Sequence, residues 1–125
     1  MSAQIIPVPP FDLVVYGGTG DLAMRKLMPA LYHRDYDGQL PDEARIIGVS
    51  RQELDHAAYR LKVEQALQKH VPHSDHEPSV KKRFLNRLFY VQLDITGNGG
   101  WKTLHRLVES LSPMMSISMY AAFLM

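Results

Sequence analysis

The chain has 125 residues, of which 46% are hydrophobic and 22% are charged, with 14 Lys and Arg against 13 Asp and Glu. This profile is typical of one soluble globular domain and excludes a two-domain enzyme. The formal net charge of +1 produces no long-range field of either sign, so composition does not indicate a nucleic-acid partner.

The sequence contains no cysteine, which excludes disulfides, thiolate metal sites and a cysteine nucleophile. It also lacks an apolar run of about 18 residues, and its N-terminus has no basic region followed by an apolar core. We therefore expect a cytoplasmic protein with no membrane contact.

The first expected elements are a strand and a helix joined by glycines. Residues 1–11 are rich in proline and predict an extended lead-in. The apolar run Asp12–Tyr16 predicts a strand buried on both faces, and it ends at Gly17–Gly20. Helical spacing of apolar residues then predicts a helix from Asp21 to about Arg34, in which Pro29 should cause a kink or a break just before it.

The remaining elements alternate in the same way. They are a strand within Ala44–Arg51, a helix Glu53–Lys69, a short helix Val80–Arg87, a strand Leu88–Ile95 and an amphipathic helix Trp101–Leu111. Residues 117–123 are a weak candidate for a fourth strand. The order βαβαβα predicts an α/β fold, a partial Rossmann-like doubly wound parallel sheet.

In a doubly wound sheet the ligand lies at the carboxyl ends of the strands, here Gly17–Gly20, Ser50–Arg51 and Asp94–Ile95. Residues Gly18 to Ala23 fit the G-x-G-x-x-A form of the dinucleotide fingerprint, in the expected position between a strand and a helix. Backbone amides at such a bend bind a pyrophosphate. The alternative is an ordinary strand–helix connection.

Two charged residues near these strand ends suggest how the cofactor is recognised. A carboxylate facing two phosphates would be repelled, so Asp21 is expected to turn back and cap the first helical amides. At the second strand end an acidic residue would favour NAD, whereas the planar cation of Arg51 suits the additional phosphate of NADP. The sequence therefore favours NADP.

The motif Gly17-Gly18-Thr19-Gly20-Asp21-Leu22-Ala23, the basic pair Arg25-Lys26 and the in-helix Pro29 resemble the start of glucose-6-phosphate dehydrogenase. The resemblance extends over about Asp12 to Val108. It implies that Gly17 through Met24 line the cofactor phosphates and that Arg51 contacts the 2′-phosphate of NADP. Met24 replaces a basic residue that is frequent there, which should weaken one peripheral charge contact.

The resemblance further implies that Asp94 and Ile95 lie beside the adenine, where a carboxylate accepts from the amino group and an aliphatic chain packs on the ring. An ordinary strand-terminal turn is the alternative for this pair. The family oxidises glucose 6-phosphate to 6-phosphogluconolactone with NADP in the pentose phosphate pathway, and its relatives form homo-oligomers. Neither the catalytic histidine motif R-I-D-H-Y-L-G-K-E nor the E-K-P lysine motif occurs here.

We therefore expect residues 12–125 to form an incomplete NADP-binding domain without the catalytic α+β domain that binds glucose 6-phosphate. The uncharged, methionine-rich tail suggests premature truncation, or a reading-frame change just past Pro113. This chain alone should be inactive and should bind NADP weakly.

Other features of the sequence suggest alternative interpretations. An extended short-chain reductase or epimerase also starts with G-G-T-G but needs a later Tyr-x-x-x-Lys pair, which is absent, and a non-catalytic NADP-sensing module is a third hypothesis. The histidine-rich loop 71–78 is interpreted as solvated and not as a zinc site, and Lys81, Lys82, Arg83 and Arg87 as a solvated helix face. His33 has no carboxylate at an informative spacing.

Overall fold

A computed structural model of the chain describes residues 11–94, 100–109 and 116–120. Several expectations lie outside these residues: the lead-in over residues 1–10, the adenine contact of Ile95, the last positions of the helix predicted to reach residue 111, and positions 121–123 of the candidate fourth strand.

Four strands form one parallel sheet in the order β3-β2-β1-β4. Their bounds are Phe11–Tyr16 for β1, Arg45–Ser50 for β2, Leu88–Gln92 for β3 and Ser116–Tyr120 for β4. The central strands β1 and β2 are almost wholly buried because both their faces are covered, which explains their continuous apolar sequences. The candidate fourth strand is confirmed, since β4 pairs with β1 from Phe11↔Ser116 to Val15↔Tyr120.

The helices connect consecutive strands. They are a π-helical turn η1 (Ala23–Leu27), α1 (Met28–Tyr36), α2 (His56–His70), a short 3₁₀ turn η2 (His73–Asp75), α3 (Pro78–Asn86) and α4 (Trp101–Glu109). Helix α2 begins later than the predicted Glu53 because Asp55 is its N-cap, and the Asp55 carboxylate accepts a hydrogen bond from the Ala58 amide at 2.7 Å.

The expected irregularity before Pro29 is confirmed. The Met28 amide donates to the Ala23 carbonyl, five residues back, so the helix widens by one residue just before the proline. A proline has no amide hydrogen, and its ring would collide with a carbonyl of a regular preceding turn. The π turn places Pro29 at the start of α1, where neither defect is costly.

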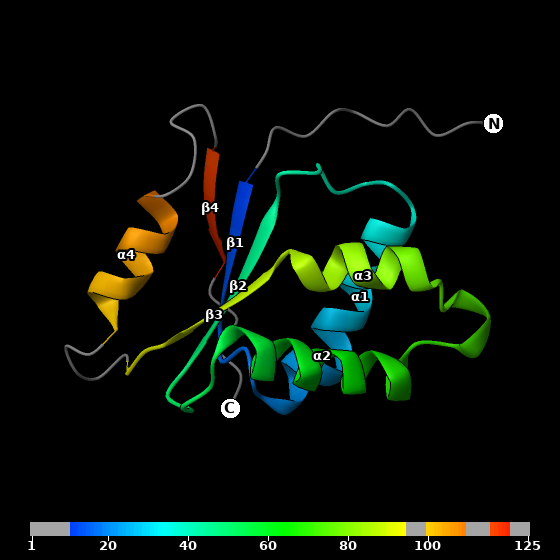
Figure 1. The fold of residues 1–125 in the computed structure, drawn as a ribbon, viewed down its shortest axis with the longest axis horizontal. Coiled ribbons are helices and arrows are strands. Elements are labelled where there is room, and N and C mark those ends of the chain that lie inside the picture. The colour runs from blue at the N-terminus through cyan, green and yellow to red at the C-terminus, as the bar shows by residue number, and fades with distance from the viewer. Residues whose placement is uncertain (1–10, 95–99, 110–115, 121–125) are drawn as a thin grey trace.

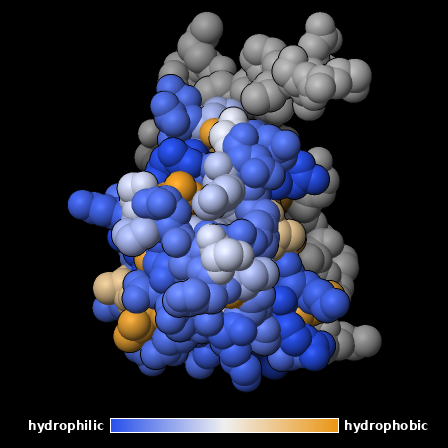
Figure 2. All heavy atoms as spheres, turned by 90° about the vertical axis from the view of Figure 1, so that its right-hand side faces the viewer, coloured by the Kyte–Doolittle hydropathy of each residue, from blue (hydrophilic) through white to orange (hydrophobic). Residues whose placement is uncertain are grey.

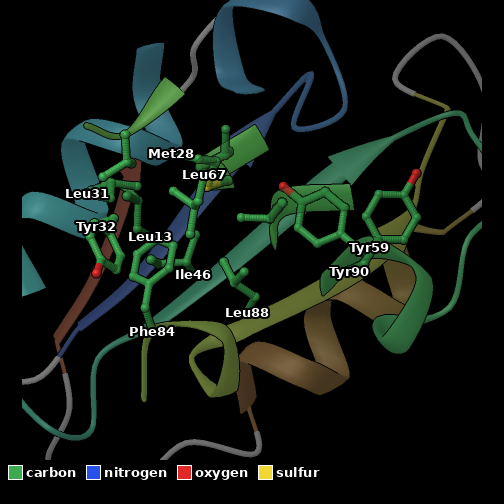
Figure 3. Packing of buried hydrophobic residues seen from close by; sticks show 13 residues of the cluster. Leu13, Met28, Leu31, Tyr32, Ile46, Tyr59, Leu67, Phe84, Leu88 and Tyr90 are labelled. Atoms are coloured by element: carbon green, nitrogen blue, oxygen red, sulfur yellow. The ribbon is translucent and has the colours of Figure 1, made fainter. Parts of the chain in front are cut away.

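The two faces of the sheet carry separate hydrophobic cores because side chains of a strand alternate between the faces. Helices α1, α2 and α3 lie on one face and α4 on the other (Figure 1). Figure 3 shows the larger core, in which Leu13 and Ile46 of the sheet pack against Tyr32, Leu67 and other side chains of the three helices. The smaller core includes Val14, Ile47 and Leu104 of α4. The predicted doubly wound architecture is thus confirmed.

The strand order reverses at β1, because α1 and α2 lead outward to β2 and β3 whereas α4 returns the chain to β4 on the other side. Such a reversal leaves a crevice at the carboxyl ends of the strands, where ligands of doubly wound proteins bind. All four strands run downward in Figure 1, so this edge lies at the bottom of the view.

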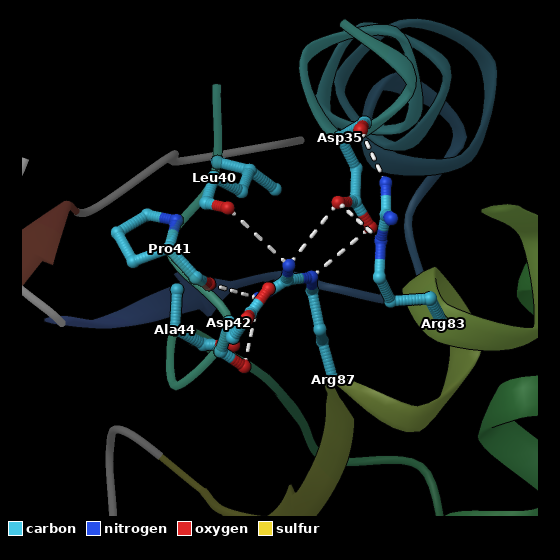
Figure 4. A network of polar contacts seen from close by, with 7 residues as sticks. All are labelled: Asp35, Leu40, Pro41, Asp42, Ala44, Arg83 and Arg87. Atoms are coloured by element: carbon cyan, nitrogen blue, oxygen red, sulfur yellow. Dashed lines mark hydrogen bonds and ion pairs between the residues drawn. The ribbon is translucent and has the colours of Figure 1, made fainter. Parts of the chain in front are cut away.

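The expectation of a solvated helix face is wrong for Arg87, whereas the side chain of Arg83 is exposed. Arg87 is buried, and its guanidinium contacts both carboxylate oxygens of the buried Asp35, at 3.0 and 3.1 Å (Figure 4). It also donates to the carbonyls of Pro41 and Ala44, and Arg83 adds a bond to Asp35 at 3.0 Å. Each buried charge has several partners, which offsets the cost of desolvation.

Loop 71–78 is also held more firmly than a solvated loop would be. His33 Nε2 lies 3.2 Å from Asp75 Oδ2, and the Tyr32 hydroxyl donates to the Asp75 carbonyl at 2.9 Å. The sequence offers no carboxylate at an informative spacing from His33, and the fold supplies one from Asp75, which is 42 residues away. In the part of the chain that the structure describes, no group of three or more His, Cys, Asp or Glu side chains is arranged to hold a metal ion.

The face on the right of Figure 1 is largely hydrophilic, with apolar residues only in small isolated spots (Figure 2). Among the described residues, no helix is long and apolar enough to cross a membrane.

Candidate functional site

The bend Gly17–Gly20 leaves the end of β1 through a backbone that favours glycine. Gly17 has φ of 71°, a conformation that side chains disfavour. The amides of Gly17 and Gly18 both donate to the Val49 carbonyl, at 2.8 and 3.1 Å, and the Gly20 amide closes the turn onto the Gly17 carbonyl at 2.9 Å. These bonds fix the bend against β2 before any ligand arrives.

The helix that follows opens with amides that have no acceptor within the helix. The Met24 amide bonds to the Gly20 carbonyl at 3.0 Å. The amides before Met24 in the first turn have no carbonyl of the helix one turn before them to accept their hydrogen bonds. Asp21 and Leu22 are exposed there, and Ala23 is fully buried. The arrangement leaves donors and the positive end of the helix dipole at the edge where a pyrophosphate is expected.

The expected cap by Asp21 is not what the structure shows. Its carboxylate pairs with Arg25 one turn further on, at 2.9 Å, and both side chains are more than half exposed. The pairing neutralises the carboxylate in part and directs it along the helix. The helix amides therefore stay available to a ligand.

Gly18 has a packing role that the sequence interpretation missed. A Cβ atom on Gly18 would lie 2.9 Å from Gly48 Cα, and one on Gly48 would lie 2.3 Å from the ring and hydroxyl of Tyr59. The two glycines form a notch that admits the Tyr59 ring of α2, whose hydroxyl donates to the Gly18 carbonyl at 2.9 Å. The signal available in the sequence was Gly48 itself, since glycine inside a strand marks a close approach.

A chain of hydroxyl groups joins the bend to the ends of β2 and β3. Thr19 Oγ1 donates to Ser50 Oγ at 3.0 Å, and Ser50 Oγ lies 2.5 Å from the Tyr90 hydroxyl. Tyr90 also reaches the Gln52 carbonyl at 2.5 Å. Three strand ends that are 30 or more residues apart in sequence are thus connected directly.

Three titratable groups near these hydroxyl groups have pKa values shifted from their usual ones. Burial raises the pKa of Tyr59 well above its usual range, and burial also raises the pKa of Tyr90 although its bond with Ser50 opposes the shift. Desolvation lowers the pKa of His56, with nearby Arg60 acting in the same direction, and His56 Nδ1 accepts a bond from the Tyr90 amide at 2.8 Å. At neutral pH both tyrosines therefore keep the proton that they donate.

Arg51 stands on a fixed backbone with an exposed side chain. The Leu93 amide donates to the Ser50 carbonyl at 2.7 Å, and the Gln92 side-chain amide donates to the Arg51 carbonyl at 3.1 Å. Arg51, Gln92, Asp94 and Gly100 line a cavity of about 370 Å³. The structure thus brings two of the predicted strand-end residues, Arg51 and Asp94, to one hollow.

Sequence reasoning also missed an aromatic neighbour of the bend. Trp101, the only tryptophan of the chain, lies with its ring centroid 6.4 Å from that of Tyr16, the residue before Gly17. Trp101 is 39% exposed. Trp101 directly follows Gly100, which lines the cavity.

A comparison with protein families agrees with this geometry. Residues 14–124 match the family described as "Glucose-6-phosphate dehydrogenase, NAD binding domain". Relatives named glucose-6-phosphate 1-dehydrogenase include one from Rhizobium meliloti, 50% identical over 87% of this chain, and one from Mycolicibacterium smegmatis, 53% identical over 77%. This chain spans about 22% and 19% of their lengths.

Solved structures show the same fold. A glucose-6-phosphate dehydrogenase in complex with its substrate glucose-6-phosphate superposes with a TM-score of 0.80 over 98% of this chain and 26% of that one, at 24% identity. The enzyme from Mycobacterium avium gives 0.75 over 92% of this chain and 24% of that one, at 25% identity. The family match over most of the chain and the shared arrangement of bend, strands and helices lead to one conclusion: the chain belongs to the glucose-6-phosphate dehydrogenase family, as part of its NAD-binding domain.

Proposed function

We propose that this chain is the NADP-binding part of a glucose-6-phosphate dehydrogenase. The observation that supports NADP over NAD is Arg51, an exposed cation at the end of β2, on a backbone tied to the glycine bend through Ser50 and Thr19. NAD sites use an acidic residue at this position to hold the ribose hydroxyls, and a guanidinium is suited to a phosphate instead.

The predicted site residues divide into three groups by their surroundings. Thr19, Gly20, Asp21, Leu22 and Met24 are at least partly accessible at the helix opening, where the unpaired amides would hold the pyrophosphate. Gly17 supports this opening through its bend conformation, and the buried Gly18 and Ala23 support it through close packing.

Arg51 and Asp94 are the groups proposed for the other half of the dinucleotide. Both line the cavity of about 370 Å³, so the 2′-phosphate would meet Arg51 while Asp94 would accept from the adenine amino group. The role of Ile95 beside the adenine stays part of the proposal, on the resemblance alone.

NADP supplies hydride-accepting chemistry when bound, and this chain contributes the binding and orientation of that group. The complete enzyme would oxidise carbon 1 of glucose 6-phosphate to 6-phosphogluconolactone, in the cytoplasmic pentose phosphate pathway. The 125 residues contain neither of the family's catalytic motifs. Residues 12–125 are therefore proposed as a cofactor-binding unit, with glucose 6-phosphate and the homo-oligomer contact belonging to other parts of full-length relatives.

The central test is a calorimetric titration of the chain with NADP and NAD. Wild type should bind NADP more tightly, and Arg51→Ala should reduce this preference about tenfold or more, because hydrogen bonds to charged groups contribute about 1.5–3 kcal/mol. Arg34→Ala, which removes an exposed arginine at the far end of α1, is the matched control. Equal affinity of the wild type for both nucleotides would refute the NADP assignment.

A second test is an assay of the purified chain with glucose 6-phosphate and NADP. We expect no formation of NADPH, since the family's histidine motif, which the resemblance assigns to removal of the substrate proton, is absent from the sequence. Measurable NADPH production would contradict the proposal that this chain only binds the cofactor.

A further inference from the structure

Two tyrosines from different elements meet behind the candidate site. Tyr59 of α2 and Tyr90 of β3 have ring centroids 4.9 Å apart, and both are buried. Figure 3 shows them side by side at one end of the larger core. The two rings are neighbours, but their hydroxyl groups bond to different parts of the sheet edge.

The Tyr59 hydroxyl acts on the glycine bend. It donates to the Gly18 carbonyl at 2.9 Å, in a contact that is wholly buried. The ring fills the notch formed by Gly18 and Gly48, so the carbonyl has little access to a replacement water. Because the peptide plane that carries this carbonyl also carries the Thr19 amide, the bond sets the orientation of the bend.

The Tyr90 hydroxyl acts instead on the segment that carries Arg51. Its single proton goes to carbonyl groups, that of Gln52 at 2.5 Å and that of Ser50 at 3.2 Å, which can only accept. Ser50 must therefore be the donor in its 2.5 Å contact with Tyr90, and Thr19 donates to Ser50 in turn. The Gln52 amide closes the loop onto Ser50 Oγ at 3.2 Å. Residues on both sides of Arg51 are thus held by one phenol.

We propose that Tyr59 and Tyr90 are positioning residues that divide the cofactor site between them. Tyr59 sets the bend that meets the pyrophosphate, which NAD and NADP share. Tyr90 sets the base of Arg51 and with it the preference for the 2′-phosphate. This inference rests on the proposed function, because it assigns the two halves of the same NADP site.

The test compares Tyr59→Phe and Tyr90→Phe, which remove one hydroxyl each and keep the packed rings. Tyr36→Phe is the matched control, since Tyr36 is exposed at the end of α1. Dissociation constants of the 125-residue chain for NAD and NADP are measured by calorimetry, with 5′-ADP and 2′,5′-ADP as smaller probes. Thermal unfolding and circular dichroism verify that each variant is folded.

Tyr59→Phe should weaken the binding of NAD and NADP by the same factor, about 2- to 10-fold for one hydrogen bond. Tyr90→Phe should weaken NADP by a similar factor and leave NAD within about twofold, so that only this variant lowers the NADP preference. Ser50→Ala interrupts the same chain without touching either ring and should reproduce the Tyr90→Phe result. A general loss of packing would change both nucleotides together and would not move the ratio.

Two results would overturn the inference while leaving the proposed function intact: wild type prefers NADP but both variants bind like wild type, or both variants lower the two affinities in parallel. A wild-type chain that binds neither nucleotide fails in a different way, because that result refutes the proposed function itself and the inference with it. Should either Phe variant fail to fold, the Ser50→Ala ratio decides the assignment of Tyr90.

Discussion

The amino edge of the sheet, where the strands begin, and the carboxyl edge, where they end, are both held by polar contacts between distant segments, but the contacts are of different kinds. At the amino edge, before β2 and β3, the buried Asp35 and Arg87 hold the connecting segments through an ion pair and backbone carbonyls. At the carboxyl edge, neutral hydroxyls of Thr19, Ser50 and Tyr90 join the strand ends. Both networks link segments distant in sequence, but only the first uses full charges.

The difference shows where the molecule keeps charge available for a ligand. In the amino-edge network the charges of Asp35 and Arg87 satisfy each other and are closed to solvent (Figure 4). The neutral network contains no charged side chain. The guanidinium of Arg51 and the dipole of the first helix therefore stay directed to the outside. A scaffold of hydroxyl groups also competes little with a phosphate for those donors.

The largest expected effect comes from breaking the ionic edge. Asp35→Ala leaves the buried Arg87 without its carboxylate, which should lower the free energy of unfolding by about 3–5 kcal/mol. Urea denaturation measures the change, with the exposed Glu43→Ala as control. A loss below about 1 kcal/mol would mean that the carbonyls alone satisfy Arg87.

The next effect concerns the packing beneath the neutral edge. Gly48→Ala forces a Cβ into the Tyr59 ring and should cost about 1–3 kcal/mol of unfolding free energy. In combination with Tyr59→Leu the added methyl finds room, so the cost of Gly48→Ala should shrink in a double-mutant cycle. Strict additivity of the two changes would show that the notch is not the cause.

A pH titration tests how much the buried Tyr59 hydroxyl contributes to stability. The pKa of Tyr59 is raised in the folded state, so its stabilising effect is complete below the unfolded value of 10.0 and is lost as pH rises above it. From pH 10 to 11, the wild type should lose about 1 kcal/mol more of its unfolding free energy than Tyr59→Phe does. Denaturation of both proteins at several pH values measures this, and Tyr36→Phe should follow the wild type.

The smallest effect is expected at an exposed ion pair. Arg25→Ala removes the partner of Asp21, but both side chains are largely solvated, so unfolding free energy should change by less than about 0.5 kcal/mol. The change should disappear in high salt, whereas the Asp35→Ala effect should persist. A large, salt-independent effect of Arg25→Ala would erase the distinction between buried and exposed pairs.

Much of the fold was predictable because its signals are local. The apolar runs of β1 and β2, the glycine bend and the irregularity before Pro29 all follow from neighbouring residues. Arg87 was misassigned because its partner Asp35 lies 52 positions away, and a basic side chain on a helix otherwise indicates a solvated face. His33 escaped notice for the same reason.

The candidate site was predictable in its outline and not in its support. Arg51 and the bend follow from position at strand ends, which the order of elements fixes. Tyr59 and Tyr90 carry no motif, and their roles depend on which atoms the tertiary structure brings within bonding distance. The hydrogen-bond partners of these hydroxyls can be identified only in the fold, which brings three separate strand ends together.

The π turn at Ala23–Leu27 has a consequence for the length of this segment. One residue corresponds to about 100° of rotation in a helix, so the extra residue sets the angular phase between the amides at the helix opening and the core side chains of α1. A single-residue deletion there would restore a regular helix and swing one set away from its target. Insertions and deletions in these few positions should therefore abolish nucleotide binding even where the hydrophobic core stays intact.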